Sequence, residues 1–117
     1  MPQGAGLPAA SSPQGTAVLE VRPLADRIGV RAAGEVSLNT RTAWQRELTT
    51  LVGRGDDVYL ELSGVTFIDV AGASALAVAA QSLDSGRRMV LDHPPPALRR
   101  TLELFWPDLP AIEVTTF

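Results

Sequence analysis

The sequence contains no cysteine and no lysine, and His93 is the only histidine among its 117 residues. Without cysteine there is no disulfide framework, no thiolate metal site and no thiol nucleophile. A single histidine is also a poor basis for a metal site, because structural and catalytic zinc sites draw mainly on histidine and cysteine. We therefore expect neither a cofactor nor a bound metal.

Long hydrophobic runs and excess positive charge are also missing. The most apolar stretch, Ala71–Ala80, is too short to span a bilayer and is interrupted by Gly72 and Ser74. Residues 1–15 have neither a basic start nor a continuous apolar core, so no signal peptide is expected. The net charge of −3 argues against a general nucleic-acid binder. The sequence predicts a cytoplasmic protein without nucleic-acid or membrane partners.

The chain divides into a short lead and one domain. Residues 1–16 are rich in proline, glycine, serine and alanine and carry no charged side chain. Such a segment buries too little apolar surface to offset the entropy lost on ordering, so we expect it to be disordered. The remaining residues, 17–117, are enough for one domain with a hydrophobic core.

Apolar periodicity predicts the element order β-β-α-β-α-β-α-β in this domain. The expected strands are 17–22, 28–34, 57–62, 87–91 and 112–115. The expected helices are 41–52, 70–83 and a third that begins at Pro95 or Pro96 and ends at Leu104. Asn39 or Thr40 is the expected cap of the first helix, and the triple proline should keep residues 92–94 extended. Repeated βα units favour a mixed, mainly parallel sheet with an antiparallel pair at its start. The predicted fold class is α/β.

The most informative stretch is residues 58–83, where an apolar strand runs into an acidic turn and then into an alanine-rich helix. Asp69, Val70, Ala71 and Gly72 should lie at the exposed end of this βα unit. The free N–H groups and the positive end of the helix dipole lie there too. Asp69 either caps the helix or contacts a partner. Gly72 allows close approach either by a partner or by the protein's own core.

Three segments resemble the STAS domain, the fold of bacterial anti-sigma factor antagonists. They are residues 34–37 (GEVS), residues 60–69 (LELSGVTFID) and residues 86–91 (GRRMVL). The resemblance covers about residues 17–115, and the middle segment is the most specific. It implies a STAS-like fold and a non-catalytic module that regulates transcription by binding another protein. The implied partner is an anti-sigma factor with a kinase-like fold or a sensor protein.

The resemblance also implies a phosphorylation switch, but part of the motif is missing. Phosphorylatable members read Asp-Ser-Ser-Gly or close to it at the acidic turn, and the partner kinase modifies the serine before the glycine. Here residues 69–72 read DVAG, so Ala71 stands at that position without a hydroxyl. Ser37 stands where many members carry an aspartate. No phosphorylation is expected at the usual position; Ser74 is an alternative acceptor, although a solvated or helix-bonded serine is commoner.

The expected partner-binding residues come from the starts of the first and second helices. They are Ser37, Leu38, Asn39, Thr40, Asp69, Val70, Ala71, Gly72 and Ser74. Since Ala71 has no hydroxyl, binding should be constitutive, or controlled by partner abundance or at another site. The alternative function is a sensory or scaffolding STAS domain that oligomerises or binds a small ligand. In that case Phe105 and a partly exposed Trp106 would support a homodimer.

Sequence patterns typical of enzymes are missing. The glycines of Gly53–Gly55 follow a predicted helix instead of opening one, unlike those of a phosphate-binding loop. Asp92 and His93 resemble part of a catalytic set, but no positioned nucleophile accompanies them. We therefore expect no enzyme activity, and we interpret His93 as a loop residue after a strand.

Overall fold

The computed structural model describes residues 18–116. Its sheet has five strands in the order β2-β3-β4-β5-β6. The strands are β2 (Leu19–Pro23), β3 (Gly29–Val36), β4 (Val58–Ile68), β5 (Met89–Asp92) and β6 (Ile112–Thr115). The β2–β3 pair is antiparallel and all other pairs are parallel, which confirms the predicted α/β class. The predicted disordered lead, residues 1–16, lies outside the described residues.

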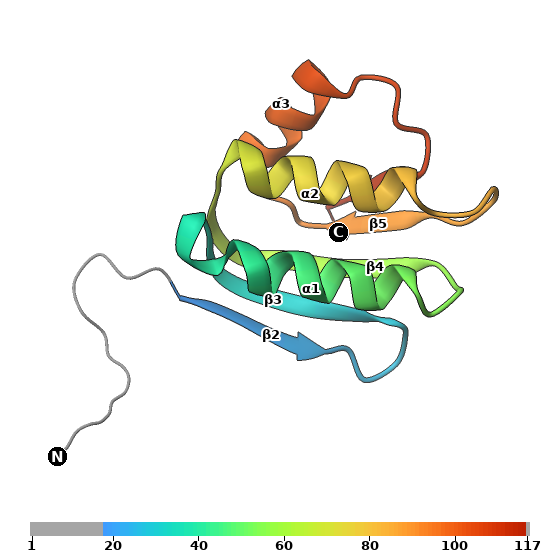
Figure 1. Ribbon diagram of the computed structural model, residues 1–117, viewed down its shortest axis with the longest axis horizontal. Coiled ribbons are helices and arrows are strands. Elements are labelled where there is room, and N and C mark those ends of the chain that lie inside the picture. Colours follow the sequence, from blue (N-terminus) through green and yellow to red (C-terminus); the bar gives the residue numbers. More distant parts are fainter. Residues whose placement is uncertain (1–17, 117) are drawn as a thin grey trace, which may run out of the picture.

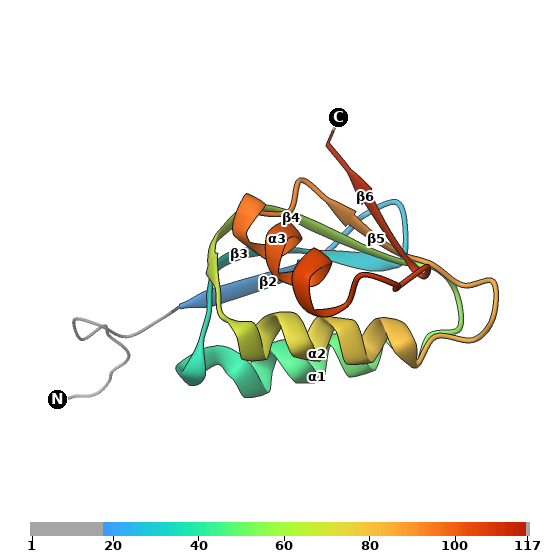
Figure 2. The ribbon, with the colours of Figure 1, turned by 90° about the horizontal axis from the view of Figure 1, so that it is seen from above.

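The helices lie on one side of the sheet. α1 (Arg41–Val52) and α2 (Val70–Gln81) run side by side, and α3 (Pro96–Phe105) lies beyond α2 on the β5 side (Figure 1 and Figure 2). A short 3-10 turn, η1 (Leu38–Thr40), leads from β3 into α1. Among residues 18–116, no helix covers the opposite face of the sheet, and none is long and apolar enough to cross a membrane.

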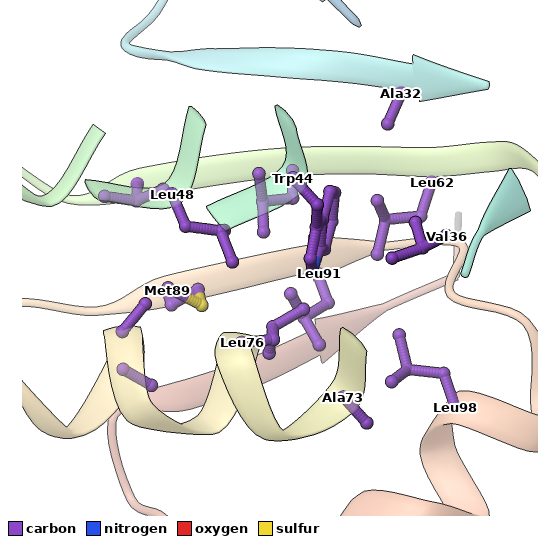
Figure 3. Close-up of a cluster of buried hydrophobic side chains, with 14 of the residues drawn as sticks. Ala32, Val36, Trp44, Leu48, Leu62, Ala73, Leu76, Met89, Leu91 and Leu98 are labelled. Carbon is purple, nitrogen blue, oxygen red and sulfur yellow. The ribbon is translucent and has the colours of Figure 1, made fainter. Parts of the chain in front are cut away.

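The hydrophobic core fills the space between the sheet and the helices. In β4, the buried residues Val58, Leu60 and Leu62 alternate with more exposed ones, as expected for a sheet covered on one face. Side chains from both layers meet in the cluster shown in Figure 3, which includes Ala32, Val36, Trp44, Leu48, Leu62, Ala73, Leu76, Met89, Leu91 and Leu98. The small side chains of α2 let this helix lie close to the sheet.

β4 is longer than the sequence predicts. It continues to Ile68, whereas Ser63 and Gly64 indicate an end at Leu62. Gly64 remains in the strand because β3 approaches it closely: an added Cβ atom would lie 2.9 Å from the Cβ of Ala33. The glycine therefore marks close contact between two strands and not the end of one.

A bulge near the end of β4 changes which side chains face the core. Gly34 pairs with Val65 and Glu35 pairs with Phe67, so Thr66 is an additional residue in β4. An additional residue inverts the alternation between the two faces of a strand. Val65 is buried at 6% exposure, and Phe67, two positions later, is 50% exposed because of the additional residue.

The expectation of an extended chain over residues 92–94 is wrong at His93, which has a φ of 55°. The His93 N–H donates to the carbonyl oxygen of Thr115 at 2.7 Å, which continues the pairing of β5 with β6. The chain must turn immediately afterwards to enter α3 at Pro96. This turn, and not the preference imposed by Pro94, sets the backbone of His93.

Candidate functional site

Two segments leave the same end of the sheet side by side. Val36 and Ile68, the last residues of β3 and β4, are paired in register. The Asp69 N–H then donates to the carbonyl oxygen of Val36 at 3.0 Å. η1 therefore begins beside the start of α2. We call the exposed and half-buried surface here the tip, which consists of Ser37, Leu38, Asn39, Phe67, Asp69, Val70, Ala71 and Ser74.

All of the predicted partner-binding residues belong to the tip except Thr40 and Gly72. Thr40 is only 8% exposed. Its hydroxyl donates to the carbonyl oxygen of Glu35 at 2.8 Å and accepts from the Ser37 N–H at 2.9 Å. Thr40 thus precedes α1 as predicted, but its side chain closes the 3-10 turn and makes no capping hydrogen bond to α1. The hydroxyl of Thr40 is therefore used within the protein itself, and the predicted partner contact at Thr40 stays a prediction.

Gly72 is buried, and its close neighbours belong to the protein's own core. A Cβ atom added at this position would lie 2.6 Å from Cγ1 of Val36 and 2.8 Å from Cγ1 of Ile68. Its carbonyl oxygen accepts a hydrogen bond from Nε1 of Trp44 at 3.0 Å. These contacts favour the internal-packing alternative for Gly72, and the predicted partner contact stays a prediction.

Asp69 caps α2, as one of its two sequence interpretations predicts. The backbone of Asp69 is extended, and its Oδ1 accepts the Gly72 N–H at 2.8 Å. This bond satisfies one of the unpaired donors in the first turn of the helix. The residue is only partly buried, so its charge also contributes to the surface of the tip.

Three large apolar side chains are exposed at the tip. The exposed fractions are 74% for Leu38, 50% for Phe67 and 57% for Val70. Exposed apolar side chains, aromatic ones above all, are common at protein interfaces. The sequence does not predict the exposure of Phe67, because alternation from Val65 places Phe67 inside unless the bulge at Thr66 is known.

A groove of about 540 Å³ runs between α1 and α2. Ala71 and Ser74 line it from α2, and Arg41 lines it from the start of α1. The Nε atom of Arg41 is buried and has no hydrogen-bond partner among residues 18–116. The position of the missing phosphoacceptor and the alternative serine therefore share one groove with a guanidinium group.

The family model described as "Mlab, STAS domain" matches residues 19–106, which is most of the chain. The chain belongs to the STAS domain family. A search of curated proteins found no significant match to this STAS domain.

Solved structures share its fold. An anti-sigma factor antagonist from Mycobacterium paratuberculosis superimposes with a TM-score of 0.70 and 21% identity, and the match covers 92% of each chain. The anti-sigma factor antagonist SpoIIAA, in its unphosphorylated form, gives a TM-score of 0.58 and 16% identity. That match covers 74% of this STAS domain and 83% of SpoIIAA. At such identities the likeness establishes the fold.

The sheet face opposite the helices carries charged side chains, among them Arg31, Glu61 and Asp92. The guanidinium of Arg27 lies 4.8 Å from the centre of the Tyr59 ring and donates to the carboxylate of Asp26. This hydrogen bond, together with the positive charge of Arg27, lowers the pKa of Asp26, and the carboxylate raises the pKa of Arg27 in turn. On the same face, His93 Nδ1 lies 3.0 Å from Asp92 Oδ1, so the two residues that resemble part of a catalytic set are in contact.

Proposed function

We propose that this STAS domain is a non-catalytic binding module that docks on an anti-sigma factor, or on a related sensor protein, through the tip, and so regulates transcription. The observation that carries the proposal is the exposure of Leu38, Phe67 and Val70 where β3 and β4 lead into the helices. The buried centre of a protein interface is more apolar than the rest of the surface, and aromatic side chains such as that of Phe67 are enriched there. The similar solved structures are anti-sigma factor antagonists, which supports this class of partner.

Binding at the tip would not be switched by phosphate at position 71. Ala71 has no hydroxyl, and it lies half-buried at the groove between α1 and α2. The partner would therefore be bound constitutively, with control through its abundance or another site. Arg41 in the same groove would favour a partner that presents an acidic group, because a guanidinium pairs strongly with a carboxylate.

The test is affinity capture of partners from a lysate of the source cell, followed by quantitative mass spectrometry. The wild-type chain should recover an anti-sigma factor or sensor protein, and the double variant Leu38→Ser/Val70→Ser should lose it. Val114→Ser is the matched control, because Val114 is 37% exposed but lies in β6, two strands away from β4 in the sheet. The proposal fails if no such protein is recovered while a phosphorylatable STAS protein captures its own partner.

A second candidate function, a self-associating scaffold, is supported by α3. Leu104 is 73% exposed and Phe105 is 56% exposed. The Phe105 ring packs edge-on against the partly exposed Trp106, with 5.9 Å between the ring centroids. A second copy of the chain would cover this patch. Light scattering over a concentration series should then show a dimer that Phe105→Ser converts to a monomer. A monomer at every concentration would leave only the first candidate.

A further inference from the structure

Glu61, Asp92 and His93 come together on the open face of the sheet, away from the tip. Glu61 in β4 pairs in register with Asp92 at the end of β5, and His93 follows directly. His93 Nδ1 lies 3.0 Å from Asp92 Oδ1 and 4.0 Å from Glu61 Oε2. One potential ligand atom from each residue lies within 4.8 Å of the other two. The fold thus adds a second carboxylate to the pair visible in the sequence.

Groups outside this cluster hold the two carboxylates in place. Arg31 Nε donates to Glu61 Oε1 at 3.3 Å, while the Ser63 N–H donates to Oε2 at 3.2 Å. On the other side, the Thr115 hydroxyl donates to Asp92 Oδ1 at 2.8 Å. Hydrogen bonds of this kind orient the ligands of protein metal sites and tune their affinity.

The backbone conformation of His93 places its imidazole beside the carboxylates of Glu61 and Asp92. Its φ of 55° is uncommon for a residue other than glycine. Its N–H is bonded to the carbonyl oxygen of Thr115 at 2.7 Å, so the backbone is fixed by β6. The side chain is therefore attached to an ordered strand end, although its ring is accessible at 42% exposure.

We propose that Glu61, Asp92 and His93 bind one zinc ion, with water at the remaining coordination position. Zinc accepts histidine nitrogen and carboxylate oxygen at about 2.0–2.2 Å, which places tetrahedral ligands roughly 3.4 Å apart. The distances from His93 Nδ1 to Asp92 Oδ1 and to Glu61 Oε2, 3.0 Å and 4.0 Å, lie on either side of this value. Small side-chain rotations would therefore bring the three ligand atoms into tetrahedral positions. The two carboxylates supply negative charge for the ion, although Glu61 is also paired with Arg31, and imidazole favours zinc over magnesium or calcium. This proposal replaces the sequence-based expectation of no metal.

The first test is isothermal titration of the untagged, metal-free full chain with zinc chloride. We expect saturable binding of one ion per chain. His93→Asn should weaken it by at least about tenfold, and Glu61→Gln should also weaken it. Asparagine is chosen because it tolerates a positive φ, and glutamine keeps an oxygen for the Ser63 N–H. Asp108→Asn is the control, since it removes an exposed carboxylate elsewhere and should leave the affinity unchanged.

A second test identifies the ligand atom. Because His93 is the only histidine, imidazole ¹⁵N resonances report on this site alone. One equivalent of zinc should shift the Nδ1 resonance, and the tip variant Leu38→Ser/Val70→Ser should give the same shift. The proposal is overturned if binding is not saturable, if His93→Asn binds zinc as wild type does, or if the imidazole resonances do not respond. Thermal unfolding of each variant shows that the fold is retained.

Discussion

Nε1 of Trp44 donates a hydrogen bond to the backbone oxygen of Gly72 at 3.0 Å inside the core. Trp44 belongs to α1 and is 1% exposed, and Gly72 lies in the first turn of α2. The bond thus links the two helices directly beneath the tip. The arrangement of the candidate binding surface depends on a side chain that no partner can touch.

Trp44→Phe should destabilise the domain by about 2–3 kcal/mol. The change removes a buried hydrogen bond, worth about 0.5–1.5 kcal/mol, and leaves a void where part of the indole packs. Urea unfolding followed by far-UV circular dichroism measures the loss. Trp106→Phe is the control and should cost less than about 1 kcal/mol, because Trp106 is only partly buried. If both variants lost the same free energy of unfolding, the Trp44–Gly72 hydrogen bond would not contribute measurably to stability.

Gly72→Ala should also lower stability, although alanine favours helices over glycine by about 1 kcal/mol. The new Cβ would lie under 3 Å from Cγ1 of Val36, which is fully buried, and from Cγ1 of Ile68. Overpacking of this kind costs about 1–3 kcal/mol. Gly53→Ala is the control for overpacking, because a Cβ atom at position 53 would have no neighbouring atom closer than 3.5 Å. That variant should unfold at the same or a higher urea concentration.

The sequence was sufficient to predict the layer architecture, because hydrophobic periodicity is set by burial against one face. The bounds of α1 and β6 match the prediction, and Asp69 caps α2 as one interpretation held. Each of these features depends on residues close together in the chain. At these positions the local sequence pattern and the tertiary structure favour the same conformation, so the sequence alone was enough to predict it.

What the sequence missed depends on residues far apart in the chain. The exposure of Phe67 follows from the bulge at Thr66, which exists only because β3 and β4 pair as they do. Thr40 is buried because its hydroxyl closes a turn at Glu35. Glu61 reaches His93 only through the register of β4 with β5. No local periodicity encodes these relationships.

Substitutions at Asp69 separate its role as a helix cap from a role in partner binding. Asp69→Ala removes the bond to the Gly72 N–H and should cost about 1 kcal/mol in urea unfolding. Asp69→Asn keeps a capping oxygen and should unfold close to wild type. If the negative charge also contacts the partner, Asp69→Asn should weaken capture while remaining stable. If Asp69→Asn captures as much partner protein as wild type does, the charge of Asp69 does not contribute to binding and the residue acts only as a helix cap.

Ala71→Ser should restore a phosphorylation switch if the tip binds a kinase-like anti-sigma factor. The new hydroxyl would lie near the start of α2, where the helix dipole favours a phosphate, and beside Arg41 in the groove. Incubation with the captured partner and ATP, followed by intact-mass measurement, should show one added phosphate and weaker binding afterwards.

Ala75→Ser is the matched control for that experiment, because Ala75 is also half-buried and lines the same groove, one helical turn further along. It should stay unmodified, since it is more distant from the helix start and from the dipole's positive end. If both variants are modified, the partner selects any accessible serine and the position of Ala71 is not special. If neither is modified by a partner that does phosphorylate other STAS proteins, the tip is not presented to its active site. Constitutive binding would then have a geometric cause, and the missing hydroxyl would not explain it.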